Sequence, residues 1–473
     1  MRNKKIYSVI EGFTSTELLR CRKFILSPYF NKNEGIIQLF ELIVHHNKLE
    51  PEEDWSDEII WEKLNTQKPY NDIRLRKYFS DLLKLIERFI AQEEYESNPT
   101  HKATHLLQGI TRRKLDKLNS SSIKTALKLS SDQKEESIDG FFYNYKIEQQ
   151  INSLNRKYNV FQDYNLDKIS FNLDTYFLIE KLRLYCQLLS IKTQKKTEDE
   201  FALVSSIIAH IESHDYSDIP QLAIYYQIFR SLKDQNEHEH YFKLRSLLEQ
   251  HGGKFRKDEA TDMYNFAINY TAHKINSGQK EFQLEYFILY KDLLNKRLIF
   301  ENNELPSNHF YNVITIALRL KDFDWVEEFI ESYKDSLNKK DRENIVTYTK
   351  AQLNFYKKDF SKVLELLRYV EYKDLSRKLS SKVMLINTYF ELGEIEALIS
   401  LLDSFRTYLG RNTQIKKDRK ERHLTFVKHV RKFVQIPRND KESLNKLKLK
   451  IEGTENLINK SWLLEKINQA LIG

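Results

Sequence analysis

Hydrophobic residues recur three and four positions apart along most of the chain. This spacing gives a helix one apolar face, because an α-helix completes a turn every 3.6 residues. Near the N-terminus the pattern predicts helices over 36–47, 56–65 and 71–94. Thr14 and Glu17 have the spacing of a capping box, which predicts that a first helix begins there. We therefore expect an all-α chain that starts with a helical domain.

Glycine and proline support this interpretation, because the chain has only 11 glycines and 7 prolines. Sheets joined by many tight turns need more of both residues. A proline inside a helix costs about 3 kcal/mol, and all seven prolines lie between the periodic segments. Longer helices are predicted over 139–159 and 171–190, joined by polar spans at 130–137 and 193–200, with no clean repeat among them.

A repeat begins further along the chain. Three short turns recur with spacings of 37 and 35 residues, KDF at 321–323, KDF at 358–360 and GEI at 393–395. Each turn lies between two amphipathic segments, so each predicts a helical hairpin, and about five such pairs are expected between 216 and 410. One hairpin cannot bury its apolar face alone. The hairpins are therefore predicted to stack into an elongated α-solenoid.

The stretch NTYFELGEIEALISLLDSF at 387–405 resembles the tetratricopeptide repeat, whose units of about 34 residues place a Gly-Asp-Tyr-like turn between two helices. The resemblance implies a right-handed superhelix of antiparallel helix pairs, with a concave surface that takes a protein or peptide. The units depart from the family pattern, because Val326, Val363 and Leu398 replace a small residue and the closing proline is missing. The family's carboxylate clamp is not carried over to this chain.

The sequence predicts that the chain is divided into four regions. A length of 473 residues exceeds the roughly 250 to 300 at which single hydrophobic cores stop growing. We expect an N-terminal helical domain over 1–99, irregular helical pairs over 100–215, tetratricopeptide-like repeats over 216–433 and a C-terminal helical cap over 434–473. The cap, with helices at 440–452 and 455–471, would cover the apolar surface of the last repeat.

Positive charge is concentrated in one segment. The chain has a formal net charge of +8, and the segment 411–432 alone carries nine basic residues against Asp418 and Glu421. On a helix beginning near Thr413, a basic face would include His423, opposite an apolar stripe. Such a strip would bind RNA, DNA or an acidic protein, whereas a merely solvated face is the alternative. The candidate binding residues are Lys416, Lys417, Arg419, Lys420, Arg422, Lys428, Arg431 and Lys432.

Motifs for catalysis are not found in the sequence. The only adjacent glycines, Gly252 and Gly253, lack the spacing of a phosphate-binding loop, and no G-x-S-x-G elbow is present. Cys21 and Cys186 lie in apolar helical contexts and are predicted to be buried, reduced thiols. We therefore expect a protein that is not an enzyme, with no catalytic residue and no cofactor.

Two histidine pairs have the spacing that puts both rings on one helix face. They are His101 with His105 and His210 with His214. Neither pair has the glutamate that follows the first histidine in a zincin, and no third ligand is evident. No metal site is predicted.

The leading hypothesis for function is a scaffold or adaptor that binds a protein or peptide partner in a helical-repeat groove. The alternative is a nucleic-acid-associated protein, either an RNA or ribosome binder using 411–432 or a regulator using 36–92. The latter segment resembles the helix-turn-helix part of bacterial regulators with repeat domains, without a wing hairpin. The chain start lacks a signal peptide and the apolar runs are too short for a bilayer, so a cytoplasmic location away from membranes is expected.

Overall fold

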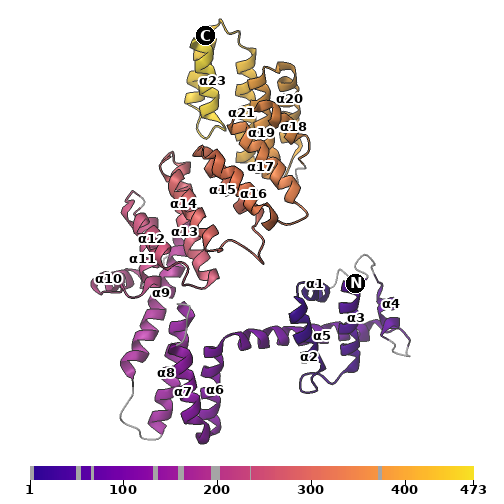
Figure 1. Cartoon of the computed structure of the whole chain (residues 1–473), viewed down its shortest axis with the longest axis vertical. Helices are drawn as coiled ribbons and strands as arrows, with labels where there is room; N and C mark the ends of the chain where they lie inside the picture. Colours follow the sequence, from indigo (N-terminus) through magenta and orange to yellow (C-terminus); the bar gives the residue numbers. More distant parts are fainter. Residues whose placement is uncertain are drawn as a thin grey trace. The chain divides into compact units, whose positions relative to one another are not determined.

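The computed structural model describes residues 5–49, 55–64, 69–131, 137–157, 165–192, 203–234, 236–370 and 375–472 (Figure 1). Regular structure within these ranges is helical, with 23 α-helices, two short 3-10 helices and one isolated bridge between Glu301 and Glu304. The all-α prediction is confirmed. No helix among the described residues has the length and apolar character needed to cross a membrane.

Two compact units make up the chain. The first comprises Met1–Tyr185 with Glu200–Asp215, and the second comprises Cys186–Asp199 with Tyr216–Gly473. The finer division into four parts stays a prediction. The polar span predicted at 193–200, and most of the one at 130–137, lie outside the described residues.

The helices of the first unit include each of those predicted over 36–47, 56–65, 71–94, 139–159 and 171–190. They are α1 (Lys5–Glu11), α2 (Ser15–Leu26), α3 (Glu34–Leu49), α4 (Asp57–Lys63), α5 (Asp72–Ser97), α6 (Pro99–Arg113), η1 (Asp116–Leu118), α7 (Asn119–Ser131), α8 (Ile138–Lys157), α9 (Leu166–Lys192) and α10 (Val204–Ser213). Helix α9 continues past Tyr185 into the second unit.

The N-terminal helix α1 corrects one prediction, because Thr14 opens the second helix and not the first. Its seven residues are too few to be stable alone, and the helix depends on packing. Ile6, Tyr7 and Ile10 are buried in the core of the first unit. The capping box itself is confirmed, since the Thr14 side chain accepts from the Glu17 N–H and the Glu17 carboxylate accepts from the Thr14 N–H.

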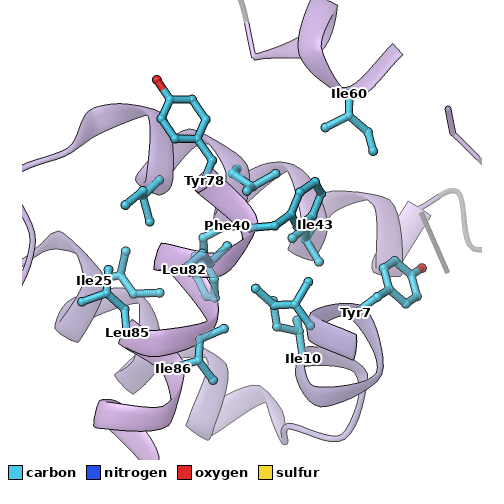
Figure 2. Close-up of a cluster of buried hydrophobic side chains, with 14 of the residues drawn as sticks. Tyr7, Ile10, Ile25, Phe40, Ile43, Ile60, Tyr78, Leu82, Leu85 and Ile86 are labelled. Atoms are coloured by element: carbon cyan, nitrogen blue, oxygen red, sulfur yellow. The ribbon is translucent and has the colours of Figure 1, made fainter. Parts of the chain in front are cut away.

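The core of the first unit gathers apolar side chains from several helices. Figure 2 shows residues of α1, α2, α3 and α5 packed together, among them Ile10, Ile25, Phe40 and Leu82. Each comes from the apolar face of its own helix, so the core follows from the three-and-four spacing of the sequence. Within the described residues 69–131 no wing hairpin follows this region, and α5 stays helical from Asp72 to Ser97.

The helices of the second unit are mostly paired as hairpins. They are α11 (Pro220–Lys233), α12 (Glu239–His251), α13 (Lys257–Asn276), α14 (Phe282–Asn295), α15 (Ser307–Arg319), α16 (Phe323–Tyr333), η2 (Lys334–Ser336), α17 (Arg342–Tyr356), α18 (Phe360–Leu367), α19 (Leu375–Leu392), α20 (Ile395–Arg411), α21 (Lys417–Gln435), α22 (Lys441–Glu452) and α23 (Lys460–Ile472). Helices α21 and α23 begin later than predicted.

Five hairpins precede α21, in agreement with the predicted pairs. Each helix from α11, α13, α15, α17 and α19 packs on the helix that follows it, and α15 also packs on α17. In Figure 1 the helices α17 to α20 lie side by side. Stacking of all five pairs into one curved row stays a prediction.

Prolines mark the helix ends, as predicted. Pro51 lies outside the described residues, and no other proline falls in the interior of a helix. The six described prolines are Pro28, Pro69, Pro99, Pro220, Pro306 and Pro437.

The recurring turns share one backbone geometry. Lys321, Lys358 and Gly393 have left-handed φ angles of 62°, 66° and 74°. In each turn the next residue donates its N–H to a carbonyl five positions back, which closes the helix as a Schellman motif. These bonds join Asp322 to Ala317 at 3.1 Å, Asp359 to Asn354 at 2.9 Å and Glu394 to Tyr389 at 3.0 Å. The first helices of these three hairpins therefore end with the same backbone motif, which explains why the turns recur at similar spacing.

Replacing one of the two lysines in these turns with glycine is expected to stabilise the protein. A left-handed φ costs a residue with a Cβ about 1 to 2 kcal/mol, partly offset by the greater flexibility of glycine when unfolded. Lys321→Gly is expected to raise the free energy of unfolding by about 0.5 kcal/mol in urea titration. The reverse change, Gly393→Ala, should lower it by about 1 kcal/mol, although a Cβ at Gly393 would meet no atom within 4 Å. Equal effects of the two changes would contradict a conformational origin.

Candidate binding pocket

The basic residues predicted as one binding strip lie on different sides of α21. Arg431 forms an ion pair with Asp403 of α20, and the Lys420 ammonium donates to the Gly410 carbonyl at 2.9 Å. Arg419 and Arg422 instead line a cavity. The remaining four are exposed and make no ion pair among the described residues, namely Lys416, Lys417, Lys428 and Lys432.

His423 was predicted on the solvent face of this helix, and that prediction is wrong. Its side chain is only 7% exposed. The His423 Nδ1 donates to the Arg419 carbonyl at 2.7 Å, and the ring packs edge-on against Phe405. The helix begins at Lys417 and not near Thr413, and its buried face includes His423 together with Phe426. A histidine can take such a place when one nitrogen is satisfied by a backbone carbonyl.

The cavity beside α21 has a volume of about 390 Å³. This volume lies within the range of small-ligand sites. Helices α17, α19 and α21 form its walls, and the segment before α23 contributes Ile458 and Asn459. The polar side chains of its helical walls are Tyr348, Gln352, Tyr356, Ser380, Asn387, Arg419, Arg422 and His423.

The spacing of the lining residues explains how three helices build one site. Residues three, four or seven apart share a helix face. On α17 the face is Tyr348, Gln352 and Phe355, and on α19 it includes Ser380 and Asn387. Arg419, Arg422 and His423 follow the same rule on α21. Each helix therefore turns one side toward the cavity.

The lining carries positive charge without a carboxylate, since no aspartate or glutamate lies among its described residues. The Arg419 guanidinium donates to the Ser376 hydroxyl at 2.9 Å, a neutral partner. Arg422 pairs with Asp418 at 2.8 Å, but Asp418 is 80% exposed and outside the lining. An exposed pair of this kind is weak. The cavity therefore favours an anionic group.

Two amide groups of the lining have unused acceptors. Asn387 is 2% exposed, and its Oδ1 has no hydrogen-bond partner within the described part of the protein. The same holds for the buried Oε1 of Gln352 on the neighbouring α17. Buried polar atoms are almost always paired, and leaving one unpaired costs about 1 to 3 kcal/mol. A ligand that donates hydrogen bonds would remove this cost.

A second, smaller cavity lies between α13, α14 and α15, with a volume of about 180 Å³. Its polar lining includes Asn276 on α13, Tyr286 on α14, and Asn312 and Arg319 on α15. Burial raises the pKa of the Tyr286 hydroxyl, so this group stays a neutral hydrogen-bonding partner. Most of the lining of both cavities comes from first helices of hairpins and from α21.

Neither histidine pair has a third potential metal ligand within reach in the part of the chain that the structure describes. The His101 and His105 Nε2 atoms lie 2.8 Å apart on an exposed face. Among the described residues, only Asp234, Glu237 and His240 bring three potential ligand atoms together, a group that the sequence reasoning missed. The Arg230 guanidinium already donates to Asp234 at 2.8 Å, so a cation is present there without a metal.

Because α21 carries two buried histidines, we expect the protein to lose stability in acid. Burial lowers the pKa of both His423 and His429, and nearby lysines and arginines act in the same direction. A histidine in the unfolded chain has a pKa of about 6.5. The buried neutral rings therefore contribute fully to folding stability above that pH, and this contribution is lost as the pH falls below it. The melting temperature should therefore fall between pH 7.5 and 5.

A substitution can test whether a buried histidine causes this pH dependence of the melting temperature. His429→Leu should flatten the fall in melting temperature, because a buried leucine carries no proton in either state. His273→Leu, at an exposed position on α13, is the matched control and should leave the slope unchanged. An unaltered slope in both variants would contradict the role of the buried ring.

Gln352 and Asn387 were not predicted as binding residues. Their signal in the sequence is a polar residue on the first helix of a hairpin, one turn from apolar residues that pack the core. Such residues are also typical of solvent faces. Comparison of the chain with protein-family models finds no match, and comparison with curated proteins finds none either, so the site rests on its geometry and charge.

Proposed function

We propose that this protein is a non-enzymatic scaffold or adaptor that binds a protein or peptide partner along the first helices of its hairpins. The observation that carries the proposal is the placement of the two cavities. One is lined by α13, α14 and α15, and the other by α17, α19 and α21. Both combine amide and guanidinium groups with apolar side chains, which suits the mixed polar and apolar surface of a peptide.

The proposal includes stacking of the hairpins as an α-solenoid of the tetratricopeptide kind. The shared turn geometry at Lys321, Lys358 and Gly393 supports it, as does the packing of α11 on α13 and of α15 on α17. In such a stack the first helices share one surface, which gives a continuous groove.

Affinity capture with the full chain tests the proposal. We expect partner proteins that survive nuclease treatment and that are lost in the variant Thr315→Trp, which fills the cavity beside α15. Glu328→Trp places the same bulk at an exposed site on the second helix of that hairpin and should retain the partners. Loss of all partners on nuclease treatment, or equal retention by both variants, would contradict the proposal.

A second candidate function is association with nucleic acid through the four exposed lysines of the basic segment. Each phosphate neutralised by a lysine releases counterions, so affinity would fall steeply with salt. Replacing Lys416, Lys417, Lys428 and Lys432 by glutamate should then abolish binding to RNA and flatten the salt dependence. Unchanged RNA binding in this variant would remove the second candidate.

A further inference from the structure

We propose that the cavity between α17, α19 and α21 recognises an acidic, extended segment of a partner protein. Arg419 and Arg422 would pair with its carboxylates, while Gln352 and Asn387 would accept hydrogen bonds from its backbone. This inference rests on the proposed function, because it names the class of partner that the groove takes.

Charge supports an acidic ligand. Two guanidinium groups lie on one face of α21, and no carboxylate faces them from the described residues of α17 or α19 that line the cavity. Among the described residues, the Arg419 guanidinium has the neutral Ser376 hydroxyl as its hydrogen-bond partner. A planar guanidinium binds a carboxylate through two parallel bonds. Arg422 pairs with the exposed Asp418 outside the lining, so no carboxylate among the described lining residues balances the charge of the cavity.

The amide groups of the lining favour a peptide over a nucleic acid. Two acceptors of the lining have no partner among the described residues, the Asn387 Oδ1 and the Gln352 Oε1. Phosphate groups of a nucleic acid have no hydrogen-bond donor, so a nucleic acid would have to satisfy these acceptors through its 2′-hydroxyls or base edges. An extended peptide presents N–H donors along its backbone together with acidic side chains. A ligand that fits this lining carries backbone N–H donors together with acidic side chains.

Apolar lining residues add a third requirement. Val383 and Met384 on α19, Phe355 on α17 and Ile458 before α23 contact the same space. Methionine adapts its shape to different apolar side chains, which is common at peptide-binding surfaces. We expect the recognised segment to carry an apolar residue beside its acidic ones.

Fluorescence anisotropy with the full chain tests the inference. The probes are labelled twelve-residue peptides of aspartate, glutamate, leucine and glycine, matched peptides with asparagine and glutamine in place of the acids, and a single-stranded RNA of twelve nucleotides. We expect the acidic peptides to bind about tenfold or more tightly than the amide peptides. Equal binding of both peptide sets, or stronger binding of the RNA at the same residues, would overturn the inference.

Substitutions locate the binding. Arg419→Gln with Arg422→Gln should weaken binding of the acidic peptide about tenfold or more. Asn387→Leu should weaken it as well while the melting temperature stays equal or rises, an outcome that a merely structural asparagine would not give. Lys339→Gln with Lys340→Gln removes the same charge from exposed positions outside the lining and should have little effect. Full binding by Asn387→Leu would overturn the role of the amide.

The result also separates this inference from the proposed function. If partners are lost with Thr315→Trp but kept by the double arginine variant, the groove binds proteins and the acidic specificity is wrong. If neither Thr315→Trp nor the arginine variant loses partners, the proposed function itself fails.

Discussion

Replacing Phe405 with alanine should lower the free energy of unfolding of the second unit by about 3 to 5 kcal/mol. Phe405 on α20 is fully buried in the cluster that joins α19 to α23, and its ring touches His423. Removing the ring loses its burial and leaves a cavity that rigid neighbouring helices fill only in part. Urea unfolding followed by circular dichroism measures the change.

The matched control for this prediction is Phe242→Ala on α12. The Phe242 side chain is 44% exposed, so its loss removes little buried area and should change stability by less than about 1 kcal/mol. Similar losses in the two variants would contradict the burial argument, because the chemical change is the same at both positions.

Asn387→Leu should have the opposite sign and stabilise the protein without ligand by about 1 to 3 kcal/mol. The wild-type asparagine buries an acceptor that has no partner among the described residues, whereas leucine adds apolar burial and no unsatisfied group. Urea titration of the full chain gives the difference. A loss of stability would show that the Asn387 amide is satisfied in the folded protein.

Asn312→Leu is the control for this second prediction. Asn312 lines the other cavity, but its amide donates to the Tyr290 hydroxyl at 3.1 Å. The same substitution there breaks a formed hydrogen bond and should destabilise the protein by about 1 kcal/mol. Opposite signs at the two positions would identify the unpaired acceptor as the cause.

Helices and their ends were largely predictable from the sequence, because local chemistry decides them. The capping box at Thr14, the prolines and the recurring turns all act over a few residues. The helix α1 was missed since Ile6 and Ile10 are held by distant neighbours and the segment is too short to show a clear period. Tertiary packing decided its structure.

The candidate site was only half predictable. The sequence marks Arg419 and Arg422 as part of a basic segment, but it does not separate them from Arg431, which lies outside the cavity lining and pairs with Asp403 of α20. Nor does it show that Asn387 is buried, because burial depends on α17 and α21, which lie some thirty residues away on either side. Counting charges in the sequence shows only that the segment is basic. Defining a site also requires knowing which groups lie next to each arginine in the folded protein.

The buried cysteines provide a way to follow each unit separately. Cys21 belongs to the first unit and Cys186 to the second, and both side chains are fully buried. Burial raises the pKa of Cys21 to about 12 and that of Cys186 as well, so neither forms the thiolate that reacts with alkylating reagents. Iodoacetamide would therefore modify each thiol only when its own surroundings open. Mass spectrometry of the two cysteine-containing peptides would report the opening rates of both halves in one untagged sample.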